Sequence, residues 1–399
     1  MAGQSLNRNW ADLPQELVEI IGNHLDSRID VFRFRAVCTS WRSFVSSTYR
    51  QSPTLLLNLP APISADAFVS LPTICRLERV DENISQPACW LTKVDESTRG
   101  EMQLLIPLSN RQIKFSPGML PNILNLLNFR LVEITKACTL KLATGRPVLG
   151  IDKAVLFPNP TQIATQFGII AIFHEGKLGY WTNGDESWTL LDDANFNYDD
   201  ILFFKGEYYV VDRNGTVFLV DSSLNLIQYS HPLCLFGNKK NLVESCGDLY
   251  AVDRYLDGER RIWRRNEDAN VINQEGSNNR ELFFNLLINY PKCRAKTVDF
   301  KVYKLDLALR RWVNVRSLDD RIFLVSNQIS FSVSAREFNV CEGNCIYYTD
   351  PNDEDFGGES SGYDARVFKL KDHSIVQGTS SLGCSPIIQP PFQVGPLII

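Results

Sequence analysis

The sequence predicts an α+β, multidomain fold: a small helical module at the N-terminus, followed by a long all-β domain. Two observations support this division. Residues 13–47 carry strong helical periodicity over a long stretch. After them, short apolar runs alternate with turn signals to the end of the chain. A cluster of prolines begins at Pro53 and disfavours helix, so we assign the module to residues 1–50 and the β domain to residues 53–399.

The apolar residues of the first predicted helix recur at the spacing of one helix face. They are Leu13, Leu17, Ile20, Ile21 and Leu25. Asp12 is expected to cap the first turn, with Gln15 three residues later as in a capping box. Pro14 is tolerated in that turn, because its missing N–H would have no helical partner there.

A second helical stripe follows a break in the pattern. Asp26, Ser27 and Asp30 are expected to end the first helix and to offer a new cap. The second stripe consists of Phe34, Val37, Cys38, Trp41, and Phe44 or Val45. A module of this size cannot bury much surface alone, so it should share a core with the rest of this chain or with another protein. Periodicity alone leaves both alternatives open.

The β domain is predicted from short apolar runs bounded by turns. Two Asn-Gly pairs, at 183–184 and 214–215, separate apolar strands and are strong hairpin signals. The predicted strands are Leu55–Leu59, Cys75–Leu77, Gln103–Leu108, Arg130–Ile134, Leu140–Leu142, Ala154–Phe157, Ile169–Phe173, Leu178–Thr182, Trp188–Leu191, Ile201–Phe204, Tyr208–Asp212 and Thr216–Asp221. Leu120–Leu127 is expected to form a short helix or a turn.

A doublet of two apolar strands around a short polar turn recurs five times. The copies begin at Gln103, Leu178, Val217, Val302 and Val367. The second and third copies are separated by about 40 residues, the usual length of a propeller blade. We therefore predict a β-propeller of about five to seven blades. A β-sandwich is the alternative, but it would not require the recurring doublet.

Composition limits the function. The chain has 399 residues, a net charge of −5 and ten cysteines. The charge argues against a general nucleic-acid binder, and no apolar run approaches the ~18 residues of a membrane span. With no secretory signal, the cysteines are expected to be reduced thiols. Cys341 and Cys345 form the one close pair and no histidine lies beside them, so we predict no metal site and no cofactor.

Two local motifs resemble catalytic or metal sites on paper. Residues 358–362 match G-x-S-x-G, but a nucleophile elbow needs a strand before it and a helix after it, and we predict a loop here. Asp350, Asn352, Glu354 and Asp355 lack the glycine and glutamate positions of an EF-hand. We predict no catalytic residue. An enzyme whose site gathers residues from distant propeller loops is the remaining alternative.

Residues 255–297 form the largest interruption of the repeats. Arg260, Arg261, Arg264 and Arg265 surround Trp263 and could form a partner-binding or nuclear-import patch. We favour a solvated strand edge, because most charge clusters only solvate a surface. The polar middle of the segment is expected to project from one blade and to be the most mobile part of the domain.

The N-terminal module resembles an F-box. The ordered set is Leu13-Pro14, Glu16-Leu17, Ile20, Leu25, Arg35, Val37-Cys38 and Trp41-Arg42. The resemblance implies a three-helix module that binds the Skp adaptor of a cullin-RING (SCF) ubiquitin ligase. The residues expected to serve this contact are Leu13, Pro14, Leu17, Ile20, Ile21, Leu25, Val37, Cys38 and Trp41. The last three could instead hold the helices together.

The C-terminal part is similar to the plant KIB-type β-propeller domain, which an F-box commonly precedes. Three blocks carry this similarity: the stretch from Phe300 to Val325, GNCIYYTD at 343–350 and GYDARVFKL at 362–370. The tail IIQPPFQVGPLII departs from the aromatic-rich ending of that family.

Together the two resemblances imply the substrate-recognition subunit of an SCF ubiquitin ligase. The F-box would bind the Skp-type adaptor, and the propeller would bind a protein target and itself perform no chemistry. We expect a cytoplasmic or nuclear location and neither a nucleic-acid nor a membrane partner. The alternative is a propeller that binds or sequesters a regulatory protein without ubiquitination, with a vestigial F-box.

Overall fold

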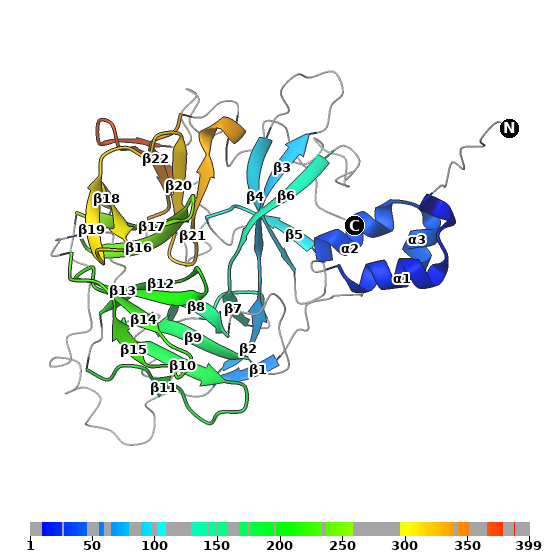
Figure 1. Ribbon diagram of the computed structural model, residues 1–399, viewed down its shortest axis with the longest axis horizontal. Coiled ribbons are helices and arrows are strands. Elements are labelled where there is room, and N and C mark those ends of the chain that lie inside the picture. Colours follow the sequence, from blue (N-terminus) through cyan, green and yellow to red (C-terminus); the bar gives the residue numbers. More distant parts are fainter. Residues whose placement is uncertain are drawn as a thin grey trace.

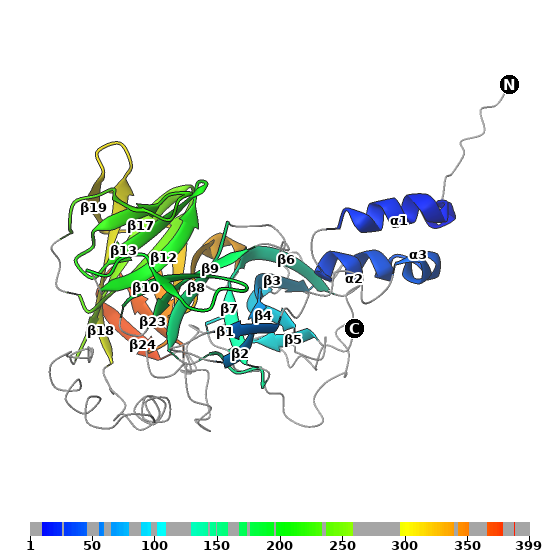
Figure 2. The ribbon, with the colours of Figure 1, turned by 90° about the horizontal axis from the view of Figure 1, so that it is seen from below.

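The computed structural model describes a helical module and a ring of sheets (Figure 1). The described residues are 10–25, 28–45, 56–59, 65–79, 89–96, 102–108, 129–142, 144–148, 150–158, 167–173, 176–194, 197–233, 237–257, 296–338, 342–350, 365–377 and 387. The helices lie to one side of the sheets in both views (Figures 1 and 2).

The helical module contains the three predicted helices. A short 3-10 turn, η1 (Trp10–Asp12), precedes α1 (Gln15–Asn23), α2 (Arg28–Ala36) and α3 (Thr39–Phe44). The predicted capping box is wrong. Asp12 lies in η1, two residues before the cap position that Pro14 occupies, and no side chain caps α1. Gln15 donates instead to the Glu19 carboxylate, at 2.7 Å from Nε2 to Oε1.

The described strands form six sheets, which we label A to F. Sheet A runs β1 (Leu56–Leu59), β2 (Ala65–Ser70), β7 (Thr139–Leu142). Sheet B runs β5 (Met102–Leu105), β4 (Cys89–Glu96), β3 (Thr73–Arg79), β6 (Phe129–Lys136). Sheet C runs β11 (Thr189–Leu190), β10 (Leu178–Thr182), β9 (Gly168–Phe173), β8 (Ile151–Phe157).

The other three sheets follow the chain more directly. Sheet D runs β12 (Tyr198–Phe204), β13 (Glu207–Asp212), β14 (Val217–Val220), β15 (Leu226–Gln228). Sheet E runs β16 (Lys239–Ser245), β17 (Asp248–Leu256), β18 (Thr297–Asp306), β19 (Arg311–Val315). Sheet F runs β21 (Ser330–Ser334), β20 (Arg321–Val325), β22 (Cys345–Tyr348), β23 (Arg366–Lys369), β24 (Ser374–Gln377).

Apolar clusters between neighbouring sheets establish the order A, C, D, E, F, B, and the ion pair of Lys141 with Asp95 joins sheet B to sheet A and closes the ring. Each cluster draws buried side chains from two adjacent sheets. Representative pairs are Leu140 and Ala154 between A and C, Ile170 and Ile201 between C and D, Phe204 and Leu242 between D and E, Val243 and Phe323 between E and F, and Leu324 and Ile74 between F and B. This arrangement confirms the predicted propeller and excludes the alternative of a β-sandwich, which has two stacked sheets.

The repeated doublets are confirmed in four sheets. The copies from Leu178, Val217, Val302 and Val367 form the outer strand pairs of sheets C, D, E and F. The turns that favour glycine also lie as predicted, with Gly184 and Gly215 at positive φ. The copy from Gln103 supplies β5 at one edge of sheet B, and its remainder lies outside the described residues.

Two features of the topology were not predicted. All four strands of sheet B are inserted between β2 and β7, which are neighbours in sheet A. In sheet F, β20 pairs antiparallel with β21 on one side and parallel with β22 on the other. The β21 strand thereby becomes an additional edge strand, packed beside β16 of sheet E.

Several predicted features lie outside the described residues. They are Leu120–Leu127, the arginines and Trp263 of the large insertion, the 358–362 motif, Cys341 and most of the acidic run near Asp350. Within the described part of the chain, no group of three potential ligands could hold a metal ion. The helices of that same part are too short and too polar to cross a membrane.

The residues that flank the large insertion pair with each other in sheet E. Leu256, the last residue of β17, pairs with Thr297, the first residue of β18. The four strands of sheet E therefore lie before residue 258 and after residue 295.

We predict that deleting residues 267–279 and joining the ends with a short Gly-Ser link leaves the thermal midpoint of the propeller nearly unchanged. Little core would be lost, because Leu256 and Thr297 are already paired. Differential scanning calorimetry measures this. A collapse of the transition would show that the deleted residues belong to the core of a sheet.

Candidate functional site

The helical module has a small core of its own. Val18 and Val31 are fully buried, and Val45 closes one end of the cluster. The rings of Phe34 and Trp41 stack with centroids 4.3 Å apart and planes inclined by 29°. Trp41 therefore packs α3 against α2, and aromatic stacking adds to its buried area.

Polar contacts hold the last two helices at a fixed angle. Arg35 Nη1 donates to the carbonyls of Arg42 (2.9 Å) and Val45, and Arg42 Nε donates back to the carbonyl of Arg35 at 3.3 Å. Cys38 is the N-cap of α3, and its Sγ accepts from the backbone N–H of Trp41 at 3.5 Å. These residues, which carry the F-box resemblance, thus stabilise the module itself.

The apolar stripe of α1 points to solvent. The exposed fractions are 46% for Leu17, 52% for Ile20 and 38% for Ile21, which lie at i, i+3 and i+4 on one helix face. Val18 and Gly22 lie on the buried face instead. Large apolar side chains are therefore about half-exposed at three neighbouring positions of α1, which makes this face a candidate interaction surface.

The other predicted contact residues divide between the core and the surface. Pro14 and Val37 are exposed, the latter by 55%. Leu13, Leu25 and Cys38 pack partly against the module core, and Trp41 is buried in it. Adaptor contact by each of these residues stays a prediction. Val18, Val31 and Gly22 were not predicted as core residues. Val18, Gly22 and Leu25 do have helical spacing, but the larger residues beside them dominated the pattern.

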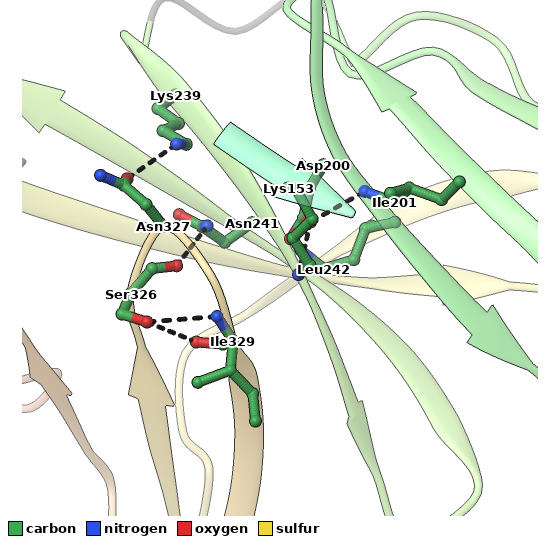
Figure 3. Close-up of polar contacts among 9 residues, drawn as sticks. All are labelled: Lys153, Asp200, Ile201, Lys239, Asn241, Leu242, Ser326, Asn327 and Ile329. Atoms are coloured by element: carbon green, nitrogen blue, oxygen red, sulfur yellow. Dashed lines mark hydrogen bonds and ion pairs between the residues drawn. The ribbon is translucent and has the colours of Figure 1, made fainter. Parts of the chain in front are cut away.

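Apart from the α1 face, a polar region lies where the edges of sheets C, D, E and F converge (Figure 3). Lys153 of β8 and Asp200 of β12 form a buried ion pair at 2.7 Å from Nζ to Oδ1. Asp200 Oδ2 also accepts from the backbone N–H of Leu242 in β16, at 2.8 Å. One carboxylate therefore connects sheets C, D and E.

Contacts of the same kind join two more pairs of neighbouring sheets, E with F and A with B. Lys239 donates to Asn327 Oδ1 at 2.8 Å, and Asn241 Nδ2 donates to the carbonyl of Ser326 at 3.4 Å, which connects sheet E with the β20–β21 turn (Figure 3). Lys141 of sheet A forms a buried ion pair with Asp95 of sheet B. These polar side chains bind one sheet to the next, so their role is to stabilise the fold.

Comparison with known proteins identifies both parts of the chain. A family model described as the KIB1-4 beta-propeller matches residues 58–369. The chain belongs to this family. A second family model, the F-box domain, matches residues 10–51 and so spans η1 to α3.

The relatives of this KIB1-4 propeller protein are named as F-box proteins. F-box protein SKIP23 of Arabidopsis thaliana is 30% identical over 375 residues, which cover 89% of this chain and 86% of that protein. Putative F-box protein At1g65770 of Arabidopsis thaliana is 30% identical over 362 residues, covering 86% and 89%. The chain is therefore an F-box protein, and an F-box ahead of a propeller supports a general role in substrate recognition.

Among solved structures, a protein of unknown function from Bacteroides thetaiotaomicron covers 78% of this chain and 76% of its own, with 10% identity and a TM-score of 0.28. A likeness of this size carries no argument about function.

Gly22 provides a test of the module core. A Cβ atom at this position would lie 2.7 Å from Cγ2 of Val45, whose branched side chain has little freedom to move. Overpacking costs roughly 1–3 kcal/mol, which exceeds the gain of up to about 1 kcal/mol in helix propensity. We expect Gly22→Ala to increase hydrogen exchange in α1. Glu16→Ala on the exposed side of the helix is the control, and equal protection in both variants would contradict the packing of Gly22 against Val45.

Asp200 provides a test of the contacts between sheets. Asp200→Asn would leave the Lys153 ammonium buried without its counter-charge and should lower the free energy of unfolding by about 3 kcal/mol. Adding Lys153→Met in the same chain removes the orphaned charge, and the new amide oxygen could still accept from Leu242, so the double variant should recover part of the loss. Chemical denaturation measures both. A double variant no more stable than Asp200→Asn would show that the broken ion pair does not cause the loss of stability.

Proposed function

We propose that this protein is the target-binding subunit of a Skp–cullin–F-box ubiquitin ligase. The apolar face of α1 would bind the Skp-type adaptor, and the propeller would bind the protein to be ubiquitinated. The observation that carries the proposal is the exposure of Leu17, Ile20 and Ile21 on a module whose own core is formed by other residues.

The energetics of the α1 face suit such a contact. Burying the exposed part of a leucine or isoleucine side chain contributes on the order of 1 kcal/mol. Three neighbouring side chains could therefore form the apolar centre of an interface. Gln15, Glu16 and Glu19 are exposed on the same helix and could supply the polar rim that interfaces require.

The mechanism under this proposal is proximity. Holding a target beside a charged ubiquitin-conjugating enzyme raises the effective concentration of the acceptor lysine, and the chain makes and breaks no covalent bond itself. The buried ion pairs between the sheets would keep the propeller rigid while it holds the target.

A matched pair of isoleucines tests the proposed adaptor face. Ile20 on α1 and Ile227 on β15 are both 52% exposed, so Ile20→Ser and Ile227→Ser remove equal apolar surface from the two domains. We expect Ile20→Ser to weaken the binding of a purified Skp-type adaptor about tenfold, because a loss of about 1.4 kcal/mol changes an affinity by that factor. Ile227→Ser should bind like the wild type. Isothermal titration calorimetry gives both affinities.

Three outcomes separate the alternatives. Equal adaptor affinity in both variants would show that Ile20 on α1 is not part of the adaptor contact. A wild-type chain that does not bind the adaptor would favour a propeller that binds a partner without ubiquitination. Adaptor binding without ubiquitin transfer in the reconstituted ligase would favour the same alternative.

A further inference from the structure

The helical module contacts an edge of the propeller. Sheet B ends at β6, which pairs with β3 on one side only. Arg33 of α2 donates from Nη2 to the backbone carbonyl of Leu131 in β6. An edge strand offers backbone groups to elements beyond the sheet, and Arg33 uses such a group to join α2 to β6.

The guanidinium of Arg33 is held in place by its own helix. Nη1 donates to Oδ1 of Asp30, one turn earlier in α2, at 2.9 Å. The planar guanidinium can therefore bind Asp30 and Leu131 through two different nitrogens at once. A lysine would keep the charge but could not present this rigid fork.

A second charge pair lies on β6 itself. Lys136 and Glu133 form an ion pair at 3.3 Å. Burial raises the pKa of the Cys75 thiol in β3 to about 12, and Glu133, Arg33, Lys136 and Asp30 all act electrostatically on that thiol. Charges of both α2 and β6 are therefore near enough to sheet B to influence the same thiol.

This contact leaves the proposed adaptor face free. Leu17, Ile20 and Ile21 keep their exposure in the presence of the whole propeller. Figure 2 shows α1 lying beside α2, with the module extending away from the sheets. The module can therefore be attached through α2 and remain open along α1.

We propose that Arg33 is a positioning residue, which fixes the F-box domain to the edge of sheet B and so sets the orientation of a bound adaptor relative to the propeller. The consequence for ubiquitin transfer rests on the function proposed above, whereas the fixed orientation does not. With the two domains held together, only acceptors in one direction come close to the conjugating enzyme. A loosely tethered domain would spread the same reach over many directions.

The orientation is measured first, on the free full-length chain. Spin labels placed through non-canonical amino acids at the exposed residues Thr39 and Ser223 report the distance between the domains by double electron–electron resonance. We expect a narrow distribution in the wild type and at least a twofold broader one in Arg33→Ala. Arg33→Lys should also be broadened, because it lacks the fork. Arg316→Ala, which removes an exposed arginine from the propeller, is the charge-matched control and should stay narrow.

The second measurement uses the reconstituted ligase with its adaptor, cullin, RING protein and conjugating enzyme. Self-ubiquitination of the propeller lysines serves as the readout, mapped by mass spectrometry. We expect Arg33→Ala to bind the adaptor with wild-type affinity but to spread ubiquitin over more lysines, with the rate at the preferred wild-type site reduced roughly threefold to tenfold. Arg316→Ala should reproduce the wild-type pattern.

The outcomes distinguish a failure of the positioning role of Arg33 from a failure of the proposed ligase function. An unchanged distance distribution in Arg33→Ala and Arg33→Lys overturns the positioning role, whatever the ligase does. A loss of adaptor binding in the folded Arg33→Lys variant also overturns it, because Arg33 would then belong to the adaptor contact. A broadened distribution in a chain that binds no adaptor supports the positioning role and refutes only the ligase function.

Discussion

The propeller depends on carboxylates that satisfy the open edges of its sheets. The backbone N–H groups of Lys240 and Leu242, on the edge strand β16, have no partner strand in sheet E on that side. Asp199 and Asp200 of sheet D accept from them at 2.9 and 2.8 Å. A buried N–H without an acceptor would cost free energy comparable to a lost hydrogen bond. Lys153 then balances the charge of Asp200. The edge of sheet E is thus completed by sheet D, so these two sheets depend on each other.

This dependence explains which elements the sequence could predict. The outer doublets, such as 217–228, combine alternating apolar residues with a polar turn, and this local pattern is sufficient to recognise them. The strand β16 begins Lys239-Lys240-Asn241 and is nevertheless buried, because its polar groups meet Asp199, Asn327 and Ser326 from other sheets. No local pattern can indicate partners so distant in the chain. The parallel pairing of β20 with β22 was missed for the same reason.

The exposed apolar face of α1 could be predicted from the sequence, but not which of the module's residues form its core. Helical spacing found the stripe of Leu17, Ile20 and Ile21, and the F-box resemblance predicts that it binds an adaptor. Spacing could not tell a face that packs inward from one that faces solvent, because both are apolar. The structure shows that α1 packs inward through two small residues, Val18 and Gly22, which allow it to approach the rest of the module closely. Arg33, which joins the module to the propeller, could not be distinguished in the sequence from any other exposed helical arginine.

The insertion of sheet B between β2 and β7 has a consequence for the order of folding. Sheet B packs on one side against sheet F, which is formed by the last strands of the chain. During synthesis, β3 to β6 therefore emerge long before β20 to β24 are made. Until then, Ile74 and Leu91 on sheet B lack the apolar surface that covers them in the finished ring. Closure is a long-range and late event, and the incomplete chain exposes an apolar face of the kind that chaperones bind. A chain that stops before residue 320 would keep that face uncovered permanently.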